Sequence, residues 1–197
     1  MEKVINDEEI EPEYGILKYE EGINLMPGKI ELSGLKISLV NVMSREGVLR
    51  SYVEMVKEQY EYVLIDCMPS LGIITINAFA CADSISIPVQ VAYLPVKGLK
   101  QLIKTIGKVK RQINPKLKIE GILLTMVDSR TNYAKEITAL LIEVYGNRVR
   151  IFENSMPMSV RAAEISADGI SIYQHDPKGK VAGAYQSLTE EVLDNGQ

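Results

Sequence analysis

The sequence predicts an α/β protein with a doubly wound, mostly parallel sheet flanked by helices. Three apolar runs carry this prediction: YVLID at residues 62–66, SISIPVQ at 84–90 and IEGILLTMV at 119–127. They are continuous rather than alternating, which is typical of parallel strands that are covered on both faces. Helical patterns fall between them, and this alternation is typical of α/β folds. A chain of 197 residues can bury a core of its own, so we expect a single domain over residues 1–197.

The helices are predicted by apolar residues at i, i+3 and i+4 spacing. The three stripes comprise Val48, Leu49, Tyr52, Val53 and Val56; Leu99, Leu102, Ile103, Ile106 and Val109; and Ile137, Leu140, Leu141, Val144 and Tyr145. INPKLK at residues 113–118 predicts a helix end before the third strand. Two weaker patterns, INLMP at 23–27 and RVRIF at 148–152, predict further strands.

The charge is low overall but unevenly spread. The formal net charge is −4 at pH 7, so the chain lacks a global basic signature of nucleic-acid binding. Residues 1–21 hold eight acidic and two basic side chains, whereas residues 84–119 hold eight Lys or Arg and no acid. The acidic N-terminus does not have the pattern of a signal peptide, and no apolar run reaches the length of a membrane span. Cys67 and Cys81 lack metal-like or CxxC spacing, so we expect a cytoplasmic protein without membrane attachment.

Asp66 ends the first apolar run and is followed by a Pro-Ser-x-Gly turn. In open α/β sheets, ligands bind beyond the carboxyl ends of the strands, so Asp66 lies where a site is expected. A carboxylate there can hold the water shell of Mg²⁺ or position an attacking water, as in a Walker B strand. It can equally cap a helix that begins near Leu71. From the residues alone, both roles stay open.

Four segments resemble one known family in the same order along the chain. They are ELSGLKISLVNVMSREGVLRSYV (31–53), YEYVLIDCMPSLGIITINAFACADSISIPVQVAYLPVKGLKQLIKTI (60–106), ILLTMVDSRTNYAKEI (122–137) and SMPMSVRAAEISADGISIY (155–173). Together they resemble the ParA/Soj family of partition ATPases, a branch of the P-loop NTPases that includes MinD. The resemblance implies a P-loop NTPase-like fold and a sandwich dimer that binds ATP and Mg²⁺ at its interface. It also implies non-specific binding to DNA and stimulation by a ParB-like centromere-binding protein.

The resemblance assigns roles to particular residues. Asp66 matches the Walker B aspartate, which would be the catalytic residue and an indirect Mg²⁺ ligand. The switch that senses the γ-phosphate would comprise Pro69, Ser70 and Gly72, and the positions near the adenine would be Thr125, Asp128 and Pro157.

The family's phosphate loop, G-x-x-x-x-G-K-[ST], is not found in the 197 residues. The nearest match, GINLMPGKI at 22–30, has five residues between its glycines and places Ile30 after the lysine. Isoleucine cannot bind Mg²⁺, so we expect a strand and a turn there. Backbone amides of the loop carry most of the phosphate binding in such proteins. We therefore expect a chain that starts downstream of the family's first strand, loop and helix and that neither binds nor hydrolyses ATP alone.

Two sets of basic residues are candidates for DNA binding. The resemblance favours Lys178, Lys180 and Arg161, although Glu153 and Met158 stand where the family is often basic. The second set follows helical spacing and comprises Lys97, Lys100, Lys104, Lys108 and Arg111. Such a stripe either contacts DNA phosphates with counterion release or forms a solvated face.

Local patterns complete the expectations. Asp128 is expected to cap a helix that begins near Thr131, and Gly169 to end a helix in the left-handed conformation. Without the family's first strand and helix, apolar surface beside residues 62–66 should be uncovered and favour self-association.

The function expected is that of a ParA-like protein of chromosome, plasmid or mobile-element partition. The alternative is a regulatory or dimerisation module that pairs with a full-length ParA paralogue.

Overall fold

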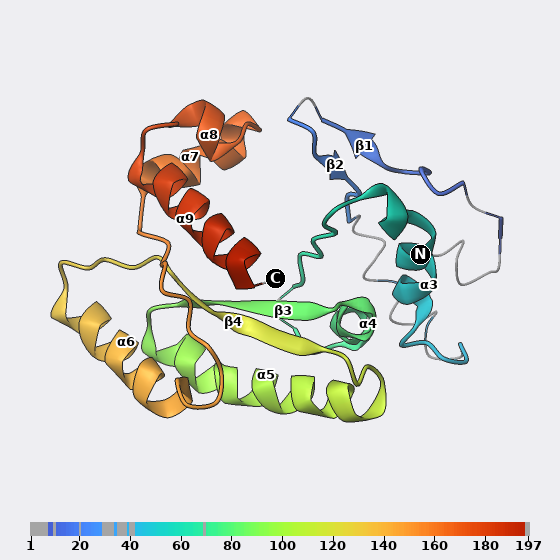
Figure 1. The fold of residues 1–197 in the computed structure, drawn as a ribbon, viewed down its shortest axis with the longest axis horizontal. Helices are drawn as coiled ribbons and strands as arrows, with labels where there is room; N and C mark the ends of the chain where they lie inside the picture. Colours follow the sequence, from blue (N-terminus) through green and yellow to red (C-terminus); the bar gives the residue numbers. More distant parts are fainter. Residues whose placement is uncertain are drawn as a thin grey trace. The chain divides into compact units, whose positions relative to one another are not determined.

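The structure is a computed structural model that describes residues 8–9, 11–19, 21–28, 34, 39, 42–68 and 70–195. Figure 1 shows the fold. The chain divides into two compact units, one of Met1–Asp83 with Lys104–Leu117 and one of Ser84–Ile103 with Lys118–Gln197. The single domain over residues 1–197 stays a prediction.

The second unit contains a parallel sheet, as predicted. Strand β3 (Ser84–Gln90) pairs in parallel with β4 (Lys118–Thr125), and the two lie side by side in Figure 1. On the other edge of β4, Ile122 pairs with Ile151 and Val127 pairs with Pro157 through single parallel bridges. The pattern at residues 148–152 therefore forms an isolated bridge rather than the full strand that we predicted.

The two strands differ in how they are covered. In β4, Ile122 and Leu124 are buried and only Lys118 is exposed, as expected for a strand covered on both faces. In β3, Ile87 and Val89 are buried whereas the residues between and beside them are exposed. The prediction of cover on both faces is therefore wrong for β3, which alternates with a period of two.

The three predicted helices are present. They are α3 (Val48–Val56), α5 (Tyr93–Gln112) and α6 (Asn132–Tyr145), each ending close to its predicted stripe. Helix α3 buries Val48, Tyr52 and Val56 at i, i+4 and i+8. In α6, the buried residues are Ala134, Ile137 and Leu141, whereas Leu140 and Val144 are exposed, contrary to the predicted stripe.

Helix α4 (Ile73–Cys81) is apolar almost throughout, and polar side chains from other segments of its unit bind carbonyl groups at its C-terminal end. The buried side chain of Asn114 donates to the carbonyl oxygens of Phe79 and Ala82 at 3.0 and 2.8 Å. Arg50 Nη2 donates to the carbonyl oxygen of Ala80. Carbonyl groups at a buried helix end need such donors, because an unpaired one is costly.

Residues 62–66 do not form the strand that we predicted. Within the described part of the chain, residues 62–68 have no regular secondary structure and join no ladder. Residues 23–27 give only β2 (Asn24–Leu25), which pairs antiparallel with β1 (Leu17–Lys18). Hydrophobicity alone does not make a strand, because a strand also needs a neighbour that supplies hydrogen bonds.

The second unit ends in three helices, α7 (Val160–Asp168), α8 (Ile172–His175) and α9 (Lys180–Asn195). Ile172, Val181 and Ala182 form a small buried cluster among them. Gly169 follows α7 with φ of 67°, which confirms the predicted left-handed helix end. Within the described ranges, no helix combines the length and the apolar character needed to cross a membrane.

Candidate functional site

Asp66 lies in the segment before α4, and Ser70 and Gly72 lie between Asp66 and this helix. Asp66 is exposed, and Gly72 occupies the N-cap position of α4 without a side-chain cap. Asp66 therefore does not cap this helix, which begins at Ile73 rather than near Leu71. Ser70 donates its N–H to Met68 at 2.7 Å, and its carbonyl oxygen accepts from the Thr75 hydroxyl. Pro69 lies outside the described residues.

The structure brings the predicted adenine-side residues of the second unit together. Val127 pairs with Pro157 and donates its N–H to Met156 at 3.0 Å, while Met158 donates to Val127 at 3.2 Å. Thr125 and Asp128 flank this bridge in the sequence. The backbone changes direction here, because Met126 directly after β4 has a φ of 53°. A left-handed conformation is uncommon for a residue with a side chain, so this turn is held by its surroundings.

Asp128 binds Arg130 rather than a helix end. Its carboxylate accepts from Arg130 Nε and Nη2 at 2.8 and 2.9 Å, and from the Arg130 backbone N–H at 3.2 Å. The side-chain hydrogen bond from Arg130 is the largest cause that lowers the pKa of Asp128 to about 2. Thr131 is the residue that caps α6, since its hydroxyl accepts from the Ala134 N–H. The prediction of Asp128 as the cap is therefore wrong, because the oxygen one turn before Ala134 belongs to Thr131.

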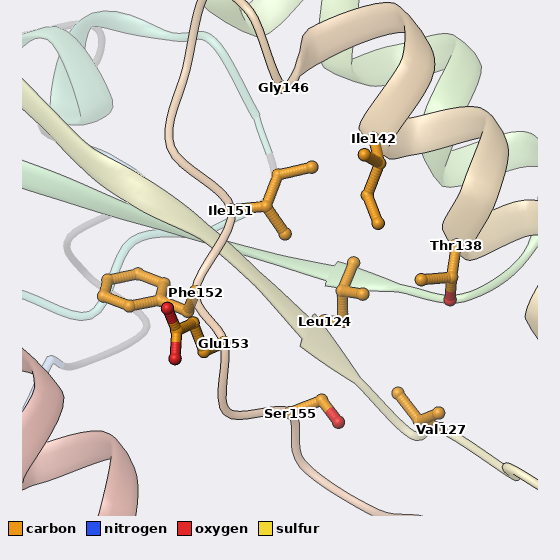
Figure 2. A pocket seen from close by; sticks show the side chains of 9 residues that line it. All are labelled: Leu124, Val127, Thr138, Ile142, Gly146, Ile151, Phe152, Glu153 and Ser155. Carbon is orange, nitrogen blue, oxygen red and sulfur yellow. The ribbon is translucent and has the colours of Figure 1, made fainter.

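A pocket of about 460 Å³ is lined by residues of β4, of α6 and of the segments that follow these two elements. Figure 2 shows Ile142 of α6 and Ile151 on two sides of it, with Leu124 of β4 below them in this view. The polar side chains of its lining are Thr138, Glu153 and Ser155, and among the described lining residues there is no lysine or arginine. Because the charged side chain among these residues is a carboxylate, they do not suit a triphosphate.

One of the candidate DNA residues of the second unit, Arg161, pairs with an acidic side chain. Arg161 Nη1 lies 3.0 Å from Asp176 Oδ2, while Lys178 and Lys180 are exposed in and after the turn that follows Asp176. A Cβ on Gly179 would collide with the Asp176 carboxylate, so this carboxylate lies over the turn. Sequence reasoning missed Asp176, although an acid in a basic segment was a signal that a nearby arginine would be neutralised.

The residues present do not fit Mg²⁺·ATP. Asp66 offers one carboxylate, but the sequence has no G-x-x-x-x-G-K-[ST] loop to hold phosphate. Within the described ranges, no three His, Cys, Asp or Glu side chains are grouped as a metal site.

Comparisons with known proteins identify the family. Residues 1–119 match the family model described as AAA domain. The chain is 40% identical over 176 residues to the sporulation initiation inhibitor protein Soj of Bacillus subtilis (strain 168), covering 89% of this chain and 69% of Soj. It is 41% identical over 172 residues to the chromosome partitioning protein ParA of Myxococcus xanthus (strain DK1622), covering 87% of this chain but only 60% of that protein.

The fold is also similar to that of a solved enzyme. Cobyrinic acid a,c-diamide synthase from Mycobacterium smegmatis, with bound ATP analog and magnesium, superimposes with a TM-score of 0.85 and 27% identity. The match covers 99% of this chain and 72% of the enzyme. With the parallel β3–β4 pair, this confirms the P-loop NTPase-like α/β fold. The identity to Soj over most of the chain, together with the matching family model, shows that this chain belongs to the ParA/Soj-type family of partition ATPases.

Proposed function

We propose that this chain takes part in DNA partition as a ParA-like protein. The observation that carries the proposal is the 40% identity to Soj over 89% of the chain, a span that includes most of the candidate residues. It is supported by Asp66, which would act as the Walker B aspartate, and by Pro69, Ser70 and Gly72, which would form the switch.

We propose further that residues 1–197 do not hydrolyse ATP on their own. An ATP triphosphate carries several negative charges and needs amides and cations around it. Asp66 would repel a triphosphate unless Mg²⁺ stood between them, and no phosphate loop is available within these residues to hold that ion in place.

The test is release of inorganic phosphate by the purified chain with Mg²⁺ and ATP. We expect no turnover above that of the Asp66→Ala variant. Turnover by the unchanged chain that is lost in Asp66→Ala would contradict the proposal, since Asp66 would then act in a complete site. Binding of a fluorescent ATP analogue, measured in parallel, separates failure to bind from failure to react.

The second candidate function is that of a regulatory module for a ParA-like protein with a phosphate loop. The retained Asp66 segment without a phosphate loop favours it, because such a chain could pair with a relative without contributing its own nucleotide. We expect the chain to change the ATPase rate of such a relative when the two are mixed. A rate that does not change over a wide range of mixing ratios would argue against this function.

DNA binding by Lys178 and Lys180 is the finer part of the proposal. Both side chains are exposed, whereas Arg161 is already paired with Asp176. We expect Lys178→Ala with Lys180→Ala to weaken binding to mixed-sequence DNA and to lower the salt slope by about 2, close to one unit for each phosphate contact.

The matched control is Lys104→Ala with Lys108→Ala, which removes two exposed lysines from α5. We expect these two substitutions to leave the salt slope unchanged. The reverse result would assign DNA binding to α5. A ParB-like partner and stimulation by it would be tested with the DNA-bound protein.

A further inference from the structure

A bulge interrupts the pairing between β4 and the segment that follows α6. Phe152 donates its N–H to the carbonyl oxygen of Ile122 at 3.0 Å, and Met156 donates to that of Leu124 at 2.8 Å. The donors are four residues apart in the sequence whereas the acceptors are two apart, so residues 153–155 leave the edge of β4. Figure 2 shows this segment passing beside β4. The pocket of about 460 Å³ opens here, since its lining includes residues from both sides of the bulge.

The bulge leaves one rung of the parallel ladder open. Ile122 directs its N–H and its C=O to this edge, since it also donates to the carbonyl oxygen of Arg150 at 2.9 Å. Residues two apart in a strand have the same orientation, so the N–H of Leu124 faces this edge as well. A regular ladder would join that N–H to the carbonyl oxygen of Phe152. Within the described residues, no hydrogen bond joins these two groups or pairs either of them elsewhere on this edge.

The other amides of the bulge are already bound. The carboxylate of Glu191 accepts the N–H groups of Glu153 and Asn154 at 2.9 and 3.0 Å, so α9 holds the bulge away from the ladder. The open rung therefore presents one donor, on Leu124, and one acceptor, on Phe152, and both residues line the pocket. Leu124 is 5% exposed and Phe152 is 4% exposed. Buried backbone groups of this kind need a water or a ligand as a partner.

We propose that this pocket binds a small neutral molecule that carries a carboxamide or lactam group on an apolar body. The carbonyl oxygen of that group accepts from the Leu124 N–H, and its own N–H donates to the Phe152 carbonyl oxygen. The ligand thereby supplies the missing rung. The charged side chain among the described lining residues is Glu153, which would repel an anionic ligand.

The rest of the lining suits an apolar body. Its aliphatic side chains are Leu124, Val127, Ile142 and Ile151. The hydroxyls of Thr138 and Ser155 add two further polar groups, and the volume is within the range of small-molecule sites. Thr125, Asp128 and Pro157, which are predicted to lie near an adenine, are not among the described lining residues. Binding in this pocket therefore does not require a nucleotide.

The test is a titration of the full chain with benzamide, followed through the backbone amide signals in NMR spectra without nucleotide or DNA. We expect the Leu124 amide signal to shift and to saturate with a dissociation constant of about 1 mM, since the ligand is small. Acetophenone has a similar shape and the same acceptor but no N–H donor, and benzoate is an anion. We expect each of them to bind about tenfold more weakly than benzamide.

Three results of the titration would overturn the proposal. A lack of saturable shifts up to the solubility limit of benzamide would leave water as the occupant of the open rung. Equal binding of acetophenone or benzoate would show that the pocket does not select an amide. Tighter binding of adenosine, with shifts of the same amides, would assign the pocket to a nucleotide instead.

A pair of variants tests the place of binding. Ile142→Ala removes part of the apolar wall and should weaken benzamide binding about fivefold. Val144→Ala is the matched control, because Val144 lies on the same helix, is 47% exposed against 53% for Ile142, and is not among the described lining residues. We expect this control to bind benzamide as the unchanged chain does. Equal weakening by both variants, or by neither, would overturn the proposed place of binding.

Discussion

Arg150 donates from Nη2 to Glu191 Oε1 at 2.6 Å, and this contact joins the segment after α6 to the last helix, α9. The side chain of Glu191 is only 9% exposed. Its carboxylate also accepts the backbone N–H groups of Glu153 and Asn154 and the amide of Asn154, at 2.9 to 3.0 Å. The Glu191 carboxylate therefore attaches the segment of residues 150–154 to α9.

Replacing Glu191 should loosen this attachment. We expect Glu191→Ala to lower the free energy of unfolding by about 2–3 kcal/mol, because Arg150 and two backbone N–H groups lose their acceptor. Glu190→Ala is the control, since Glu190 is exposed and its carboxylate accepts from Gln186 Nε2 at 3.3 Å. Urea denaturation of both variants measures the difference, and equal losses would argue against the role of Glu191.

The pH dependence of stability gives a separate test of the same group. Burial favours protonated Glu191, but hydrogen bonds from Glu153 and Asn154 and the charge of Arg150 together lower its pKa below the ordinary 4.5. A carboxyl whose pKa is lower in the folded state stabilises the protein fully above its unfolded pKa. That contribution is lost as the pH falls through the folded value. Unfolding midpoints of the unchanged chain and Glu191→Gln should therefore converge at acid pH and differ most near neutrality.

Substitution of Asn77 should destabilise the fold more than substitution of most other polar residues in the first unit. It is fully buried and accepts the Leu49 N–H at 3.1 Å, so it satisfies the start of α3, where Gly47 provides no side-chain cap. Its amide donates to the carbonyl oxygens of Arg45 and Ile73 at 2.8 and 3.0 Å.

We expect Asn77→Ala to cost about 2–3 kcal/mol of folding free energy, because buried groups are left without partners. Asn77→Asp keeps the acceptor but loses both donated bonds, so it should also be destabilising when measured by thermal unfolding. Stability unchanged in both variants would show that these bonds contribute little.

The sequence was most informative where structure depends on local periodicity. The bounds of β3 and α3, the parallel β3–β4 pair and the left-handed Gly169 were all predictable, because each depends on nearby residues. The strand predicted at residues 62–66 does not form within the described part of the chain, and this was not predictable, because pairing depends on residues far apart in the sequence.

In the candidate site, too, some features were predictable from the sequence and others were not. The resemblance placed Thr125, Asp128 and Pro157 near one another, and the Val127–Pro157 bridge agrees with this. The partners of the charged groups were not foreseen. Arg130 pairs with Asp128 and Arg161 pairs with Asp176, and both contacts depend on turn geometry that periodicity does not predict.

The cap of α6 can be tested by separating Thr131 from Asp128. Thr131→Ala should cost about 1 kcal/mol, the usual effect of removing an N-cap hydroxyl. Asp128→Ala should cost less, because its partner Arg130 has an 87% exposed side chain. In an NMR titration, the Asp128 carboxyl should have a pKa of about 2, rising towards 3.8 in Arg130→Ala. A larger loss from Asp128→Ala than from Thr131→Ala would restore Asp128 as the cap.

Gly121 of β4 offers the sharpest test of packing around the bridge. A Cβ at this position would lie 2.8 and 3.0 Å from Cε2 and Cδ2 of Phe152, whose ring is buried and lies 5.2 Å from the Arg150 guanidinium carbon. We expect Gly121→Ala to cost about 1–3 kcal/mol, because a buried ring in a packed core can move little. Phe152→Leu should relieve the collision, so the double variant should lose less stability than the sum of the single variants.

Gly183→Ala in α9 is the control, since no atom lies within 4 Å of its Cβ position, and alanine there should stabilise the helix by roughly 1 kcal/mol. Additive losses at Gly121 and Phe152 would show that the two residues do not touch in this way.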